Sequence, residues 1–397
     1  MKILLVKQLR IKNFKLIDEA ELAFSRVNVL IGPNGSGKSS VLHALNAVRA
    51  LMPDANGHPK LFLGDAWHSY GDIVYMHDYS RFIVLYVKGA LELAKGVKMG
   101  YELELKVDSE KGGRSRLKLD VNEEDAWSFE NDALSHPVGS GSKRGYEVGG
   151  CFVTLEGRYD NPMVSLYRGR RERATLLLRE DFSNLLERYV GWCPAFRGKV
   201  EHVIPSSPPE PLKVVAGRPE LKEELNKLLT EILNFKSKVD IASTVEGGLS
   251  LLNVAFRVNV ALEAFSMSQL LYMLPLGLAL PRGGLLLVEE PEIHLHPAAQ
   301  ARLTESLIKV ARERNLQLIL TTHSEHILFR VLTLVREGVL PHSELKIHYF
   351  ERGRDPPKAL IEEIKVNERG EMDKGLRGFF EAELDEFERF IRAKARG

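Results

Sequence analysis

The sequence is poor in cysteine and in long apolar runs, and each shortage excludes a class of protein. Its two cysteines, Cys151 and Cys193, cannot build a disulfide framework or a four-thiolate zinc site, and they favour a reducing compartment. The most apolar stretch, residues 270–288, is interrupted by two prolines and an arginine, so no membrane span is expected there. Residues 1–14 alternate like a strand and do not resemble an apolar secretory leader. We therefore expect a cytoplasmic protein with no membrane partner.

The chain also lacks net charge. It carries 55 lysines and arginines against 54 aspartates and glutamates, a formal charge of +1. Because the chain is not basic overall, any binding of DNA must use a local patch. Two clusters are candidates, although a solvated, arginine-rich helix start is the slightly better interpretation of the first. The clusters are Arg168, Arg170, Arg171, Arg173 and Arg179 near Tyr167, and Arg10, Lys12 and Lys15 beside Phe14.

What the sequence does contain is a complete G-x-x-x-x-G-K-[ST] motif at residues 32–39. An apolar, β-branched run precedes it and a helix-like pattern follows it, which is the strand–loop–helix context of a phosphate-binding loop. Its amides and Lys38 would hold the phosphates of ATP, and the Ser39 hydroxyl would bind Mg²⁺. A glycine-rich turn without a ligand is the less favoured alternative. The expected nucleotide-binding residues are Gly32, Pro33, Asn34, Gly35, Ser36, Gly37, Lys38, Ser39 and Ser40.

A pair of acids lies far downstream of this loop. The apolar run 285–288 is typical of a strand buried on both faces, and it ends at Glu289 and Glu290. Next to a phosphate-binding loop, this pattern predicts Glu289 in the Mg²⁺ shell and Glu290 as the residue that polarises the attacking water. An acidic turn that caps the next helix is the alternative. Another apolar strand leads to His323, which would donate to the γ-phosphate, so Lys38, Glu290 and His323 are the candidate catalytic residues.

These motifs resemble those of the ABC-type P-loop ATPases, and within them the SMC/RecF/OLD-like branch of DNA-transaction ATPases. The resemblance rests on residues 9–15 with the phosphate loop that follows, on 290–297 and, more weakly, on 373–380. It implies an α/β P-loop NTPase head of two lobes, with an antiparallel β lobe and a mixed or parallel core sheet. It also implies an ATPase that binds ATP and Mg²⁺ and then forms a head-to-head homodimer. An aromatic residue such as Phe14 is a candidate for stacking on adenine.

The ABC signature is degenerate in this chain. Family members carry L-S-G-G-Q shortly before the acid that ends the second motif strand, where this chain has Ser266, Met267, Ser268 and Gln269. The resemblance implies that Ser266, Ser268 and Gln269 contact the γ-phosphate bound to the opposite subunit. Bulk at Met267 in place of glycine would weaken that approach. The alternative is that these residues simply begin a core helix.

Other positions depart from the family pattern as well. The usual Q-loop glutamine has no counterpart, and His77 or Asp78 is the candidate for its place. His296 stands where many relatives carry an aspartate, and Glu289 replaces the commoner aspartate. These departures bear on turnover and on communication between subunits more than on nucleotide binding.

Two histidine-containing segments have spacings that suggest metal ligation. His294 and His296 lie close to Glu290 and Glu292 in sequence, but the loop that follows the acid pair in the family explains the block better than a metal cluster does. After His323, we interpret Ser324 as the N-cap of the next helix and not as part of a metal site.

The region between the phosphate loop and the downstream motifs distinguishes the branches of the family from one another. It shows no sustained heptad pattern and no Cys-x-x-Cys hook, so we expect no long coiled-coil arm of the SMC type. No D-x-D pair follows His323, so we also expect no fused nuclease domain. The expected parts are a first lobe with the phosphate loop (1–121), an inserted β and helical region (122–243), a second lobe with the signature, the acids and His323 (244–343), and a closing β-hairpin and helix (344–397).

Periodicity predicts the remaining elements. Antiparallel strands are expected at 81–88, 101–107, 116–121, 150–156 and 163–167, with a long polar loop over 122–150. Helices are expected over 171–189, 219–238 and 375–392. The leucine face of the second helix fits the protein core better than a partner surface.

Two functions stay open on the sequence. In the first, ATP drives a dimeric ATPase that acts on DNA in repair or defence. In the second, the protein is a nucleotide-switched interaction module that controls a separately encoded effector, such as a nuclease, with little DNA affinity of its own. The ATPase subunit of a transporter is less favoured because of the N-terminal pattern, the missing Q-loop glutamine and the large insertion.

Overall fold

The computed structural model describes most of the chain. The described residues are 3–49, 62–63, 66–67, 73–94, 97–108, 112–121, 124–132, 138–139, 144–148, 151–156, 163–168, 171–177, 190–193, 203–204, 210–234, 238–243, 249–254, 258–259 and 265–376. The helix predicted at 375–392 lies almost wholly outside these ranges.

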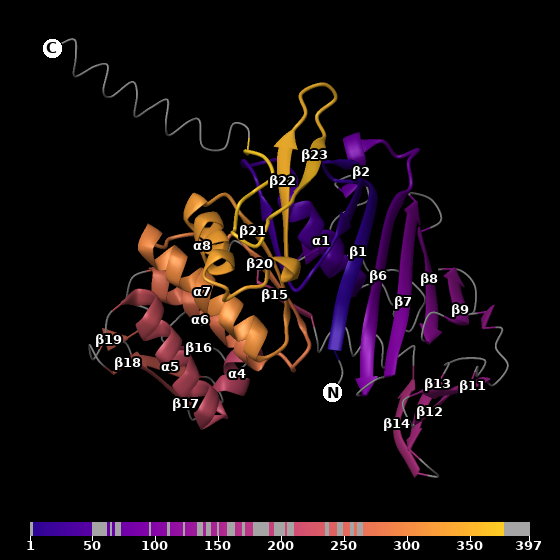
Figure 1. Ribbon diagram of the computed structural model, residues 1–397, viewed down its shortest axis with the longest axis horizontal. Helices are drawn as coiled ribbons and strands as arrows, with labels where there is room; N and C mark the ends of the chain where they lie inside the picture. The colour runs from indigo at the N-terminus through magenta and orange to yellow at the C-terminus, as the bar shows by residue number, and fades with distance from the viewer. Residues whose placement is uncertain are drawn as a thin grey trace.

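The core of the fold is a six-stranded sheet whose strands come from distant parts of the chain (Figure 1). Its strand order is β15 (Val190–Cys193), β20 (Leu285–Glu289), β21 (Gln317–Thr322), β3 (Val27–Ile31), β22 (Leu345–Arg352) and β23 (Ala359–Ile364). The first five strands are parallel, and β23 returns antiparallel to β22. Every residue of β3, β20 and β21 is buried, as expected for parallel strands covered on both faces.

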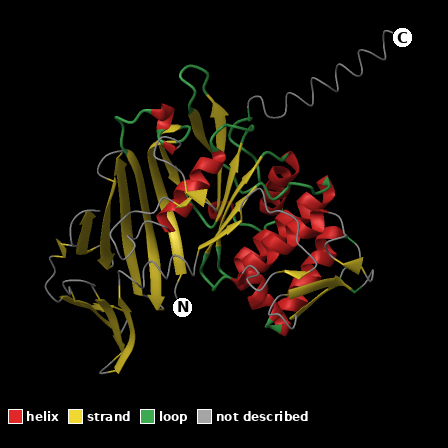
Figure 2. Cartoon of the chain, turned by 180° about the vertical axis from the view of Figure 1, so that it is seen from behind, coloured by secondary structure: helices red, strands yellow, loops and turns green. Residues whose placement is uncertain are grey.

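Helices cover one face of this sheet, and Figure 2 shows them gathered on one side of it. They are α4 (Glu210–Ala216), α5 (Pro219–Leu233), α6 (Phe265–Ala279), α7 (Pro297–Glu313) and α8 (Glu325–Arg336). The buried face of α5 consists of Leu221, Leu225, Leu228, Leu229 and Ile232. This helical spacing buries an apolar stripe against the neighbouring helices, so the assignment of the leucine face to the core is confirmed.

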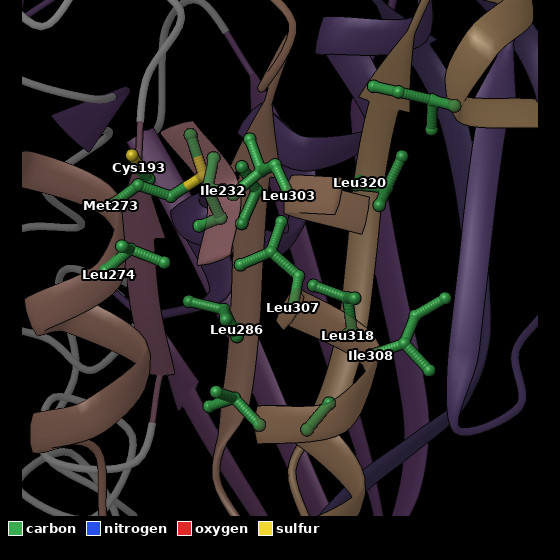
Figure 3. Close-up of a cluster of buried hydrophobic side chains, with 14 of the residues drawn as sticks. Cys193, Ile232, Met273, Leu274, Leu286, Leu303, Leu307, Ile308, Leu318 and Leu320 are labelled. Carbon is green, nitrogen blue, oxygen red and sulfur yellow. The ribbon is translucent and has the colours of Figure 1, made fainter. Parts of the chain in front are cut away.

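Strands and helices share one hydrophobic core (Figure 3). Leu286 of β20 and Leu318 of β21 cluster with Leu303 and Leu307 of α7, and all four are at most 1% exposed. Each such leucine contributes roughly 2 kcal/mol when it is removed from water. This packing holds β20 and β21 in place against α7.

The opposite face of the core sheet is covered by α1 (Lys38–Arg49), and beyond α1 lies a seven-stranded antiparallel sheet (Figure 1). The strand order is β10 (Val138–Gly139), β9 (Glu124–Asp132), β8 (Gly112–Val121), β7 (Val97–Asp108), β6 (Ile83–Ala94), β1 (Ile3–Phe14) and β2 (Ile17–Ala23). Alternate residues of β6, namely Ile83, Leu85 and Val87, are buried. One face of the sheet thus packs inward, as the period of a strand requires.

A buried glutamine joins the two sheets. Gln317, the first residue of β21, is 1% exposed. Its Oε1 accepts a hydrogen bond from the Val6 amide at 2.8 Å, and its Nε2 donates to the carbonyls of Val6 and Ser25 at 2.7 Å each. Val6 borders a register shift in the pairing of β1 with β6. The side chain of Gln317 therefore satisfies backbone groups next to an irregularity in the strand pairing.

Three smaller sheets complete the described part. One consists of β11 (Arg144–Val148), β12 (Cys151–Glu156), β13 (Met163–Arg168) and β14 (Arg171–Leu177), which Figure 1 shows below the seven-stranded sheet. Another consists of β16 (Val203–Ile204), β17 (Val239–Ser243), β18 (Leu249–Asn253) and β19 (Val258–Asn259). The third is the pair β4 (Phe62–Leu63) and β5 (Ala66–Trp67).

The α/β class, the antiparallel β lobe and the mixed core sheet are confirmed, but two local predictions are wrong. The loop predicted over 122–150 contains β9, β10 and β11 instead, because these segments pair with the neighbouring strands β8, β9 and β12. The helix predicted from Arg171 is a strand as far as Leu177, where it pairs antiparallel with β13. Residues 178–189 of that predicted helix lie outside the described part.

Part of the region 122–243 belongs to the core of the fold and not to a separate insertion. The strand β15 and the helices α4 and α5 lie within it, yet β15 is an edge strand of the core sheet and both helices contribute to the core. Across the residues described above, no helix combines the length and the apolar character needed to cross a bilayer.

Candidate active site

The phosphate loop leaves the carboxyl end of β3 and enters α1 at Lys38. Gly32, Gly35 and Gly37 have φ angles of 153°, 71° and 101°, which side chains of L-residues rarely allow. Ser36, Lys38 and Ser40 are buried, whereas residues 33–35 are exposed and form the rim of the loop. The Ser36 hydroxyl is buried without a hydrogen-bond partner, which is consistent with a loop that binds an anion.

Lys38 folds back over its own loop. Its Nζ donates to the carbonyl oxygens of Gly32 and Pro33, both at 2.8 Å, and the residue is 3% exposed. Burial lowers the pKa of Lys38, and the negative charges of Glu290, Glu292 and Glu289 oppose that shift. The loop lysine and the downstream acids therefore lie within one electrostatic environment, although about 250 residues separate them in the chain.

The strands β22 and β23 support the loop from behind. A Cβ atom at Gly32 would lie 2.1 Å from the Phe350 carbonyl oxygen, and one at Gly37 would lie 2.9 Å from the Ala359 Cβ. A Cβ at Gly35 would lie 3.7 Å from Nη1 of Arg352, so this exposed guanidinium stands beside the rim of the loop. Sequence reasoning did not find Arg352, because only the fold brings the end of β22 to the loop.

The two acids at the end of β20 are held differently. Glu289 is 7% exposed and lies level with Thr321 in the parallel pairing with β21. Glu290 is partly exposed and has a left-handed φ of 44°, and its amide donates to the carbonyl oxygen of Thr321 at 3.0 Å and to the Thr321 Oγ1 at 3.2 Å. Burial raises the pKa of Glu290, as do Glu292 and Glu289, while His323 and Lys38 lower it. A strained, partly buried carboxylate of this kind is typical of a functional site.

Glu292 organises the end of β21. It is 5% exposed, and its Oε1 accepts from the Thr322 hydroxyl at 2.7 Å and from the His323 amide at 2.8 Å. The Nδ1 of His323 lies 3.3 Å from the same oxygen. The sequence analysis placed Glu292 only in a rejected metal cluster, and its position two residues after Glu290 was the one local signal for it. In the described part, no group of three or more His, Cys, Asp or Glu side chains is arranged to hold a metal ion.

Lys15 extends the site from the other lobe. It follows β1 with a left-handed φ of 51°, and its Nζ contacts Nδ1 of His43 on α1. Burial lowers the pKa of Lys15, and Glu289 opposes that shift. Of the basic residues predicted near the nucleotide, Arg10 and Lys12 instead lie near Glu19 on the exposed side of the sheet. Lys15 is thus the one of the three that reaches the acids.

The proposed stacking of Phe14 on adenine is wrong. Phe14 is fully buried, although it lies two residues after the exposed Lys12 and should share its face by alternation. The cause is Asn13, whose left-handed φ of 56° breaks the alternation and turns Phe14 into the core.

The chain matches two ATPase family models and is similar to curated proteins. A family model described as "AAA domain, putative AbiEii toxin, Type IV TA system" matches residues 170–328, and one described as "AAA ATPase domain" matches residues 1–85. The chain is 23% identical over 372 residues to an OLD nuclease of Thermus scotoductus, covering 84% of this chain and 62% of that protein. It is 30% identical over 118 residues to a DNA replication and repair protein RecF of Proteus mirabilis, covering 30% of this chain and 28% of that protein.

The matches to these ATPase models and relatives support an ABC-type P-loop ATPase of the SMC/RecF/OLD branch. The chain spans less than two thirds of the length of each of these curated relatives. Similar solved structures include an SMC head domain from Thermotoga maritima, at 13% identity, a TM-score of 0.43 and coverage of 91% of this chain and 99% of that one. An SMC head bound to the C-terminal winged-helix domain of ScpA matches at 11% identity and a TM-score of 0.48, covering 90% and 97% of the two chains.

The degenerate ABC signature lies on the first turn of α6. Ser266 is partly exposed, but Met267, Ser268 and Gln269 are at most 2% exposed. Because α6 is packed between α5, α7 and the core sheet, its first turn points two of the predicted residues inward. The side chains of Ser268 and Gln269 are thus buried in this conformation, and their contact with a nucleotide on a second copy stays a prediction. Ser266 is the predicted signature residue that remains accessible.

The other departures from the ABC pattern also have local explanations. Asp78 accepts hydrogen bonds from Ser80 and pairs with Arg81, and the Ser80 hydrogen bonds lower its pKa. His296 caps α7, its Nδ1 accepting from the Ala298 amide at 3.3 Å. The N-cap role predicted for Ser324 is confirmed, because its hydroxyl accepts from the Ile327 amide. For His77 and His296, the family roles stay predictions.

Proposed function

We propose that this ABC-type ATPase binds Mg²⁺–ATP at the carboxyl ends of β3, β20 and β21, hydrolyses it and acts as an ATP-dependent head-to-head dimer in DNA transactions. The observation that supports this most is the convergence of Lys38, the acids Glu289 and Glu290, and His323 at one edge of the core sheet. Such an edge is where open α/β sheets bind their ligands. A parallel sheet could bring these residues together only there.

The residues fit the phosphates of a nucleotide. The glycine backbone, the unpartnered Ser36 hydroxyl and the N-terminus of α1 form an anion cradle. Lys38 would exchange the carbonyls of Gly32 and Pro33 for the β- and γ-phosphates, and its burial makes that charge-assisted contact strong. Ser39 and Glu289 would hold Mg²⁺, which when bound would neutralise charge on the phosphates.

Catalysis in this proposal is positioning together with charge stabilisation. Glu290 would orient the water that attacks the γ-phosphate, and burial raises its pKa, which makes it a stronger proton acceptor than an exposed carboxylate. His323 would donate to the γ-phosphate oxygens. Ser266 of a second copy and the exposed rim at residues 33–35 would close the site in the dimer.

Glu290→Gln tests the enzymatic part. We expect the variant to bind ATP, to lose hydrolysis by at least about 100-fold and to accumulate as an ATP-bound dimer that light scattering detects. The matched control is Glu305→Gln, which removes an exposed carboxylate that pairs with Arg330 on the outer surface. A Glu290→Gln variant that hydrolyses ATP at the wild-type rate would remove this role from Glu290.

A gel-shift titration with duplex DNA, with and without ATP and over a range of salt, tests the DNA part. ATP-dependent binding that weakens steeply with salt is the expected result. The relatives named RecF and OLD nuclease support it. Hydrolysis without any DNA binding would contradict it and leave the nucleotide-switched control of a separate effector as the function.

A further inference from the structure

We propose that Glu292 is a positioning residue for His323: its carboxylate holds a proton on Nδ1 and leaves Nε2 as the ring nitrogen that meets the substrate. The inference rests on the proposed function, and it assigns to the acid two residues beyond Glu290 a task that the family resemblance did not provide. The juxtaposition that carries it is one buried carboxylate oxygen shared by the Thr322 hydroxyl, the His323 amide and the His323 ring.

The position of the Glu292 carboxylate does not depend on the His323 ring. Glu292 is 5% exposed, and two short hydrogen bonds, at 2.7 Å from Thr322 and 2.8 Å from the His323 amide, anchor Oε1. Nδ1 of His323 therefore lies 3.3 Å from an oxygen that two hydrogen bonds hold in place. The imidazole itself is 41% exposed, so its other edge faces the open side of the site. An ionised carboxylate only accepts hydrogen bonds, so its closeness to Nδ1 favours the ring form that carries a proton on that nitrogen.

The tautomer decides what His323 can do. With the proton fixed on Nδ1, a neutral ring offers Nε2 only as an acceptor. Donation from Nε2 to a phosphate oxygen then requires a proton on both nitrogens, with the Nδ1 proton directed at Glu292. Among the described residues, the charged groups that interact electrostatically in this region include Glu289, Glu290, Glu292 and Lys38. Glu292 would thus orient the His323 ring so that Nε2 is the nitrogen directed at the substrate.

The arrangement costs stability, which argues for a functional origin. The second oxygen of Glu292, Oε2, is buried without a hydrogen-bond partner. A buried, half-satisfied carboxylate is unfavourable, and an uncharged residue would tie the turn to β21 at lower cost. A purely structural tie would therefore not require a carboxylate here.

The first test does not depend on turnover. Detection of ¹⁵N-labelled histidine rings by NMR distinguishes protonated from unprotonated ring nitrogens, and His323→Gln assigns the signal among the 12 histidines. We expect the proton of the neutral ring on Nδ1 in the wild-type protein, and a loss of that preference in Glu292→Ala. A proton on Nε2 in the wild-type protein would overturn the proposal, whether or not the protein hydrolyses ATP.

The second test is a double-mutant cycle on ATP hydrolysis. Glu292→Gln keeps an oxygen that accepts from Thr322 and from the His323 amide but removes the charge. We expect kcat to fall by roughly 10- to 100-fold with little change in KM, because the substituted residue orients a group that acts in the transition state. In a His323→Ala background, Glu292→Gln should add almost nothing, since it acts through the ring that is missing.

Ser324→Ala is the matched control. It removes the N-cap of α8 next to His323, so it should lower stability by about 1 kcal/mol and leave kcat unchanged. Two results would overturn the proposal: wild-type kcat in Glu292→Gln, or a loss of equal size with and without His323. A wild-type protein without ATP hydrolysis would instead refute the proposed function and leave the NMR result to decide the role of Glu292.

Discussion

The replacement Gly32→Ala probes how the loop is supported. A Cβ atom at this position would lie 2.1 Å from the carbonyl oxygen of Phe350, and the φ of Gly32 is 153°. That oxygen belongs to β22, which is hydrogen-bonded to β3 and fully buried at Phe350. Because the Phe350 carbonyl belongs to the backbone of a strand inside the core sheet, β22 will stay in place and the phosphate loop must move.

The size of the effect follows from the distance. Cβ atoms essentially never approach another heavy atom within 3.0 Å, so the loop must shift by roughly 1 Å at its first residue. A misplacement of about 1 Å in a catalytic site costs on the order of 100-fold in rate. We therefore expect kcat/KM for ATP to fall by about 100-fold and the affinity for the nucleotide to fall with it.

Gly338→Ala is the matched control, because Gly338 also has a positive φ, 71°, but has no atom within 4 Å of its would-be Cβ. It should cost roughly 1–2 kcal/mol of unfolding free energy through backbone strain alone and leave nucleotide binding intact. Calorimetric titration with a slowly hydrolysed ATP analogue, together with thermal unfolding, separates the two effects. Equal nucleotide affinity in Gly32→Ala and Gly338→Ala would refute the reasoning.

Two further predictions concern stability. Gln317→Leu removes three hydrogen bonds, two of them buried and joining β21 to Val6 of β1, and should lower the unfolding free energy in urea by roughly 2–4 kcal/mol, against less than about 0.5 kcal/mol for Gln8→Leu on the exposed surface; similar losses would contradict the bridging role. Burial lowers the pKa of His348 to about 4, below its usual 6.5. As the pH falls, His348 is therefore protonated in the unfolded chain before it is protonated in the folded protein. Unfolding free energy should therefore drop by roughly 3 kcal/mol between pH 7 and pH 4, and His348→Met should flatten that drop; an unchanged pH dependence would refute this origin.

The sequence predicted the phosphate loop and the acid pair because each is a local pattern whose chemistry dictates residue type and spacing. It also predicted the central strands, since runs such as 285–288 are apolar at every position. The polar strands β9 and β11 were missed because pairing with neighbouring strands, and not local composition, decides their conformation.

Within the site, the sequence did not predict contacts that only the fold creates, or a side chain that turns to the other face of its strand. Nothing local indicates that Glu292 meets His323, 31 residues further on. A single left-handed residue, Asn13, reverses the face of Phe14. The buried first turn of α6 depends on the helices that pack around it, so Ser268 and Gln269 could not be placed from their spacing.

The measurement that tests the central claim most directly is the affinity of the purified protein for Mg²⁺–ATP with and without the Lys38 side chain. The two hydrogen bonds from Nζ to the loop carbonyls are available for exchange with phosphates, so Lys38→Ala should weaken binding by roughly 10- to 100-fold. Lys309→Ala, an exposed lysine on α7, should leave the affinity unchanged. A wild-type protein that does not bind the nucleotide, or a Lys38→Ala variant that binds it as tightly as the wild type, would contradict the account.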